Sequence, residues 1–140
     1  MAMATVNPAT GETEFEAELH TPAEVETRIA LAQTAHETLR AMSYAERVAL
    51  MIKAADLIES EVEQTAVMLT REMGKPIAQS RGEVLKCAKV MRFYAEKAEE
   101  FLAPQVLADP SNVNASQAMG IWQPLGVVLA VMPWNYPLWQ

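Results

Sequence analysis

The apolar residues of this chain follow three different spacings, and each spacing predicts a different element. Near the N-terminus, Phe15, Ala17 and Leu19 alternate with glutamates, which is the period of a strand with one solvated face. Between residues 21 and 102 the apolar positions recur every three or four residues, which predicts helices. Residues 127–132 are apolar throughout, the pattern of a strand covered on both faces in a parallel sheet.

Three predicted helix starts share one signature, an N-cap hydroxyl followed three residues later by a glutamate. Such a pair can satisfy two of the backbone N–H groups that a first helical turn leaves without partners. We therefore expect helices to begin at these positions. The pairs are Thr21 with Glu24, Ser43 with Glu46, and Ser60 with Glu63.

A fourth and longer helix is predicted after Gly74, which falls where a left-handed C-cap belongs. Pro76 suits the first helical position, and the apolar stripe continues to about Leu102. At 1.5 Å per residue this helix is about 40 Å long and should cross a second layer. Gly82 inside it predicts a close neighbour, because a helical glycine costs about 1 kcal/mol relative to alanine.

The region between Pro104 and Pro124 predicts two strands joined by a turn at residues 109–112. Two such strands alone are only marginally stable in water. We therefore expect them to pair with another subunit or with a segment outside this chain. The turn at residues 7–11, which contains Pro8 and Gly11, similarly separates the N-terminal residues from the first predicted strand.

Composition narrows the possible functions. The net charge is -7, from 18 acidic against 11 basic residues, so a phosphate backbone would be repelled and no nucleic-acid partner is expected. No signal-peptide pattern opens the chain. The apolar run at residues 125–139 is shorter than the roughly 20 residues of a spanning helix and contains two prolines, so no membrane partner is expected. With a single cysteine, these features predict a cytoplasmic protein.

Few side chains suggest chemistry. Cys87 lies within the fourth helix beside apolar residues, which predicts a buried structural thiol instead of a nucleophile. His20 and His36 have no partners at ligand spacing, so no metal site is expected. The carboxylate runs are typical of solvated helix surfaces, and no glycine-rich phosphate loop occurs.

Asn135 is the exception. It follows the apolar run at residues 127–132, just beyond the expected carboxyl end of that strand, where ligands bind in open α/β sheets. The simpler interpretation is a buried edge strand followed by a proline-rich turn, and composition alone leaves both open.

Six short motifs are spread along the chain. They are Asn-Pro-Ala-Thr-Gly-Glu at 7–12, Thr-Arg-Glu-Met-Gly-Lys-Pro at 70–76, Leu-Lys-Cys-Ala-Lys at 85–89, Arg-Phe-Tyr-Ala at 92–95, Pro-Leu-Gly-Val at 124–127 and Met-Pro-Trp-Asn-Tyr-Pro at 132–137. Taken together, these motifs resemble the aldehyde dehydrogenase family, in the family's order and over essentially the whole chain. Within the family, bacterial succinate-semialdehyde dehydrogenases are the most similar at residues 7–12 and 129–140. The resemblance implies a chain about three times as long, of which these residues are the N-terminal portion.

The resemblance implies an incomplete α/β fold: N-terminal helices and the first parallel strand of a Rossmann-like cofactor-binding domain, with an antiparallel β oligomerisation arm. The implied boundaries are 1–104 for the N-terminal strand and helical part, 105–123 for the oligomerisation strands, and 124–140 for the first sheet strand and its loop. The arm implies a homo-oligomer, a dimer or a tetramer.

The resemblance also implies a reaction and its residues. NAD or NADP would accept hydride while a cysteine thioester forms on the way from a small aldehyde to the acid. Asn135 matches the asparagine whose amide stabilises the oxyanion, and Tyr136 matches an aromatic residue of the aldehyde tunnel. The cofactor's nicotinamide end would lie against Met132, Pro133, Trp134 and Asn135.

The nucleophile and the general base of the family lie beyond position 140, so the 140 residues alone are expected to be inactive. The residues alone also allow a different hypothesis, in which the chain is a self-contained helical module whose apolar C-terminal segment docks a partner protein.

Overall fold

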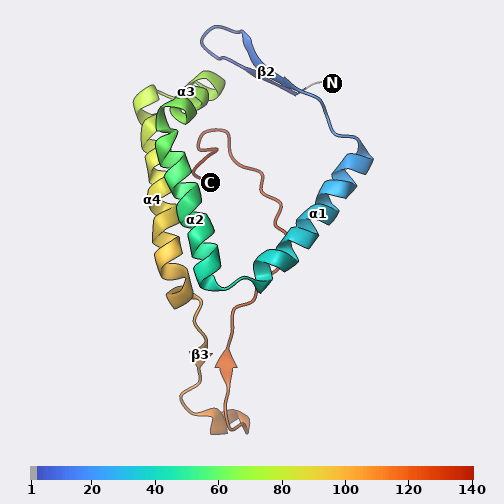
Figure 1. The fold of residues 1–140 in the computed structure, drawn as a ribbon, viewed down its shortest axis with the longest axis vertical. Coiled ribbons are helices and arrows are strands. Elements are labelled where there is room, and N and C mark those ends of the chain that lie inside the picture. The colour runs from blue at the N-terminus through green and yellow to red at the C-terminus, as the bar shows by residue number, and fades with distance from the viewer. Residues whose placement is uncertain (1–2) are drawn as a thin grey trace.

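The computed structural model describes residues 3–140, in which a helical bundle is flanked by two small antiparallel sheets. Figure 1 shows α2, α3 and α4 packed together, α1 standing apart from them, and the C-terminal segment returning to the bundle. In chain order the elements are β1 (Met3–Val6), β2 (Thr13–Ala17), α1 (Pro22–Ala41), α2 (Tyr44–Ser60), α3 (Val62–Met73), α4 (Ile77–Phe101), β3 (Gln105–Val106), the 3-10 helix η1 (Pro110–Val113) and β4 (Met119–Gly120).

Two of the three predicted capping boxes are confirmed. The Thr21 and Ser43 hydroxyls each accept a hydrogen bond of 3.3 Å from the backbone N–H of the glutamate three residues later. The third prediction is wrong, because α2 continues through Ser60 and the Ser60 hydroxyl donates to the Leu57 carbonyl at 2.8 Å instead. Helix α3 therefore begins without a side-chain cap.

The corner between α3 and α4 is formed as predicted at Gly74, whose φ of 74° is left-handed. A Cβ at Gly74 would lie 3.0 Å from Cγ of Pro8, so the absence of a side chain at position 74 also allows Pro8 of the N-terminal turn to approach this corner closely. Pro76 is the N-cap of α4 and not its first helical residue. The prediction for Gly82 is wrong, since a Cβ there would meet nothing within 4 Å.

The hydrophobic core lies within the α2–α4 bundle and consists mainly of small side chains. Helix α1 contributes nothing to it: the helix forms as predicted, but Val25 and Ile29 on its apolar stripe remain 42% and 56% exposed. The stripe of α1 is thus an apolar surface without a cover among residues 3–140. The buried apolar residues are Ala55, Ala66, Leu69, Val84, Cys87, Ala88 and Ala95.

Both sheets are antiparallel and two-stranded. The strand predicted near Phe15 is confirmed as β2, but burial does not follow the expected alternation: Phe15 is 60% exposed, whereas Glu14 is half-buried. Glu14 turns inward because its carboxylate pairs with Arg71 of α3 at 2.6 Å. The two strands predicted after Pro104 are confirmed as β3 and β4, each only two residues long.

The predicted parallel strand at residues 127–132 is not formed, and Leu129 and Val131 are 89% and 82% exposed. A strand needs the N–H and C=O groups of a neighbouring strand, and residues 3–140 place none beside it. The accessible surface is 10867 Å². A compact monomer of this mass would expose about 7,200 Å². The helices, small sheets and excess surface agree with the incomplete α/β fold expected from the sequence.

Candidate functional site

The proline-rich segment at residues 133–139 is the part of the C-terminal region that docks onto the bundle. Leu138 packs against the cluster of Ala66, Leu69 and Val84. The ring of Trp139 lies under the ammonium of Lys86, with 3.7 Å between Nζ and the ring centroid. We call residues 134–139 the docked loop.

Lys75 and Glu83 place two opposite charges beneath the docked loop. Lys75 lies between the left-handed Gly74 and Pro76, so the corner between α3 and α4 directs it inward. Glu83 lies on the buried face of α4 with Ser80, Val84 and Cys87, at spacings typical of one helix face: Glu83, Val84 and Cys87 come three, four and seven residues after Ser80. The side chains are only 4% and 0% exposed, and they form an ion pair.

Both charges also bond the backbone of the docked loop. Lys75 Nζ donates to the carbonyl of Asn135 at 3.0 Å and lies 3.5 Å from the ring centroid of Tyr136. Glu83 Oε1 accepts from the backbone N–H groups of Leu138 and Trp139 at 3.1 and 3.0 Å. The loop is therefore held at both ends by one buried ion pair.

The predicted site residues lie together on this loop and on the segment that leads into it. Asn135 is exposed, and within residues 3–140 its side-chain amide makes no hydrogen bond, although its carbonyl is fixed. Met132 and Trp134 are 39% and 75% exposed. Tyr136 is engaged by Lys75 on its ring face and is 42% exposed. The arrangement presents one free amide beside exposed apolar side chains.

Cys87 is buried, as predicted from the helix stripe. Burial raises the pKa of its thiol above the ordinary value of 9.0, and the negative charge of Glu83 raises it further. A thiol with a raised pKa is a poor nucleophile at neutral pH. The structure thus supports the structural role for Cys87.

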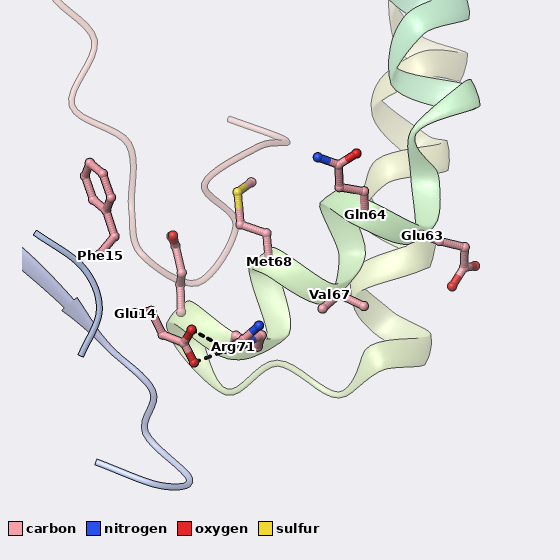
Figure 2. A pocket seen from close by; sticks show the side chains of 8 residues that line it. Glu14, Phe15, Glu63, Gln64, Val67, Met68 and Arg71 are labelled. Atoms are coloured by element: carbon pink, nitrogen blue, oxygen red, sulfur yellow. Dashed lines mark hydrogen bonds and ion pairs between the residues drawn. The ribbon is translucent and has the colours of Figure 1, made fainter. Parts of the chain in front are cut away.

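A hollow lies elsewhere, between β2 and α3 (Figure 2). It encloses about 500 Å³ and is lined by residues that include Phe15, Val67 and Met68, with the Glu14–Arg71 ion pair at its edge. None of its lining residues belongs to the docked loop. It is an open surface depression separate from the candidate site.

Across residues 3–140, no three His, Cys, Asp or Glu side chains gather closely enough to hold a metal ion. In the same part of the chain, every helix is too short or too polar to cross a membrane.

Sequence reasoning missed Lys75 and Glu83 as site residues. Glu83 belongs to a chain rich in exposed carboxylates, which suggested solvated helix surfaces. Its signal was positional, since it falls on the same helix face as the apolar residues Val84 and Cys87. Lys75 had no comparable signal, because the contact with residue 135 spans 60 positions in sequence.

Comparison with known proteins adds the wider context. A profile described as "Aldehyde dehydrogenase family" matches residues 1–140. An aldehyde dehydrogenase of Paenarthrobacter nicotinovorans is 49% identical over all 140 residues, which cover 31% of that protein. "Succinate-semialdehyde dehydrogenase [NADP(+)] 1" of Mycobacterium tuberculosis (strain ATCC 25618 / H37Rv) is 51% identical over the same residues, which cover 30% of it.

Solved structures agree with these sequence matches. The succinic semialdehyde dehydrogenase of Streptococcus pyogenes, solved in complex with NADP+, superposes with a TM-score of 0.88 at 30% identity. The match covers 97% of this chain and 29% of that one. This chain therefore spans about 30% of the length of the curated relatives, in agreement with the expected N-terminal portion.

Proposed function

Because this chain belongs to the aldehyde dehydrogenase family, we propose that it acts as the N-terminal part of an enzyme that oxidises an aldehyde to the carboxylic acid. The proposed substrate is succinate semialdehyde and the proposed cofactor is NADP, after the names of relatives that are 51% and 30% identical. The observation that carries the proposal is the family match along residues 1–140, combined with a free Asn135 amide on a fixed loop.

In this proposal Asn135 stabilises the transition state. Its side-chain N–H donates to the aldehyde oxygen as that oxygen gains negative charge, and the fixed backbone keeps the donor in place. Removing one such donor typically lowers kcat by about 10²- to 10³-fold. The nucleophile would come from residues outside these 140.

The exposed side chains around Asn135 would form part of the cofactor and substrate surface. Met132, Pro133 and Trp134 offer an apolar and aromatic wall, which suits the flat face of a nicotinamide ring. Bound NADP would supply the hydride acceptor. The ring of Tyr136 would line the route of the aldehyde, on the side opposite the Lys75 ammonium.

The proposed assembly is a homo-oligomer, a dimer or tetramer. Strands β3 and β4 form an isolated pair with two paired positions, and neighbouring strands of a second subunit would extend it. The proposed division of the chain is 1–104 for the helical part, 105–123 for the oligomerisation strands and 124–140 for the first sheet strand with its loop. A cytoplasmic location remains part of the same proposal.

The test is a chimera that joins residues 1–140 in frame to the part of the M. tuberculosis relative that follows its matched 140 residues. With succinate semialdehyde and NADP, we expect the chimera to reduce the cofactor and the 140-residue chain alone to give no turnover. An inactive but folded chimera would contradict the proposal. If the 140-residue chain were then a monodisperse, cooperatively unfolding monomer, the interaction-module hypothesis would be favoured.

Asn135→Ala in the chimera tests the role of the amide. We expect kcat to fall by about 10²-fold or more with KM nearly unchanged, because the contact strengthens mainly in the transition state. Gln79→Ala is the matched control, since Gln79 carries an exposed side-chain amide on α4, outside both the docked loop and the proposed oligomerisation strands. An unchanged kcat would remove Asn135 from the mechanism.

A further inference from the structure

The Lys75–Glu83 pair has more hydrogen-bonding capacity than an ion pair alone uses. One oxygen of Glu83 pairs with Lys75, and the other accepts from two backbone N–H groups of the docked loop. The ammonium of Lys75 donates to the Asn135 carbonyl and also faces the Tyr136 ring. Among residues 3–140, every other hydrogen bond and ring contact of the two charged groups goes to residues 135–139.

Stability alone does not account for this arrangement. Removing two charges from water costs about as much as their mutual attraction returns, and well-packed apolar residues at such a site often give equal or greater stability. An apolar pair would, however, leave the loop without polar anchors. What the charges add is a specific set of hydrogen bonds: the Lys75 ammonium donates to a backbone carbonyl, and the Glu83 carboxylate accepts from two backbone N–H groups.

These contacts fix the backbone on both sides of Tyr136 and Pro137. The carbonyl of Asn135 is held on the N-terminal side, and the amides of Leu138 and Trp139 are held on the C-terminal side. With its carbonyl fixed, Asn135 retains freedom mainly in its side-chain torsions. The pair therefore sets where the Asn135 amide can point.

We propose that Lys75 and Glu83 are positioning residues, which hold the docked loop so that the Asn135 amide meets the aldehyde oxygen. The inference rests on the proposed function, because the amide has a target only if the chain serves an aldehyde dehydrogenase. Neither residue touches the reacting atoms in this account. Their effect passes through the backbone of residues 135–139.

The deciding variant is Lys75→Met with Glu83→Leu in the chimera. It removes both charges together, so that neither charge is left buried without its partner. We expect the double variant to fold, with kcat lowered about 10- to 100-fold and KM for aldehyde and NADP changed less than about 3-fold. The matched control is Glu63→Leu with Arg81→Met. That ion pair bridges α3 and α4 at 2.8 Å but is exposed, and its loss should leave kcat unchanged.

Hydrogen exchange provides a readout that does not depend on activity. In the parent chimera the amides of Leu138 and Trp139 should be protected, and in the double variant they should exchange faster. Protected amides in a parent without aldehyde oxidation would contradict the proposed function but not the anchoring. Unprotected amides in the parent, an unchanged kcat in the double variant, or failure of the double variant to fold would each overturn the positioning role.

Discussion

Two regions of the molecule differ in how far their apolar residues are buried: the α2–α4 bundle with its docked loop, and α1 together with residues 121–132. In the bundle, Leu69 and Val84 are 5% and 0% exposed. In the other region, Ile29 is 56% exposed and Leu129 is 89% exposed. Both regions have clear apolar patterns in the sequence. Only the first finds its packing partners within residues 3–140.

Local signals do not explain the difference. Helices α1 and α2 begin with the same complete capping box, yet α2 packs along α4 and α1 packs on no other helix to a comparable extent. The difference lies in the partner surfaces. Helix α4 packs along α2, and Arg92 of α4 also forms an ion pair of 2.7 Å with Asp56 of α2. A complete capping box thus favours the formation of a helix, whereas burial of the helix's apolar face requires a second surface to pack against.

The largest expected effect concerns the core of the bundle. Leu69→Ala in the 140-residue chain should lower the free energy of unfolding by about 2–5 kcal/mol, because it removes buried methyl groups and leaves a cavity. Leu129→Ala in the same chain should change it by less than about 0.5 kcal/mol. Urea titration followed by circular dichroism measures both.

The same two substitutions in the chimera sharpen the comparison. If the added residues cover the 121–132 segment, Leu129→Ala should become as costly as Leu69→Ala. Equal effects of the two substitutions in the 140-residue chain would contradict the contrast between the regions.

A smaller effect is expected at the helix starts. Ser43→Ala should lower the free energy of unfolding of the bundle by about 1 kcal/mol, since the first turn of α2 loses its side-chain cap. Thr21→Ala removes the same cap from α1 and should reduce helical ellipticity without moving the urea midpoint. A shift of the midpoint by Thr21→Ala would show that α1 unfolds together with the bundle.

The smallest expected effect is a dependence on acid. The carboxylate of Glu46 accepts hydrogen bonds from the backbone and hydroxyl of Ser43, which hold its pKa below the ordinary value of 4.5. A lowered pKa in the folded state contributes stability above pH 4.5 that is lost as the pH falls through the lowered pKa. Glu46→Gln should flatten the pH dependence of the unfolding midpoint below pH 4.5, and an unchanged profile would contradict the link.

Much of the fold could be predicted from the sequence because the signals are local. The hydroxyl-glutamate pairs at Thr21 and Ser43, the left-handed Gly74 and the paired strands β3 and β4 all depend on residues close in the chain. The prediction of an N-cap at Ser60 is wrong for a local reason too. A serine three residues before a glutamate can also end a helix, and here the Ser60 hydroxyl donates to the Leu57 carbonyl in the preceding turn.

The rest depends on contacts that local patterns do not encode. The apolar run at residues 127–132 has the composition of a buried strand, but forming one requires neighbouring strands. For the candidate site, the sequence identified the loop and Asn135 through motif resemblance. It did not identify the Lys75–Glu83 pair, because burial of a lysine in a corner and of one glutamate among many is decided by tertiary packing.

The long sequence span of the Lys75 contact has a consequence for the order of folding. The ion pairs that join the bundle helices connect residues 18, 33 and 36 positions apart, whereas the Lys75–Asn135 bond closes a segment of 60. Longer closures cost more chain entropy and form later. During synthesis the bundle residues leave the ribosome before Asn135 does, so the helices can assemble first and form the surface on which the loop then docks.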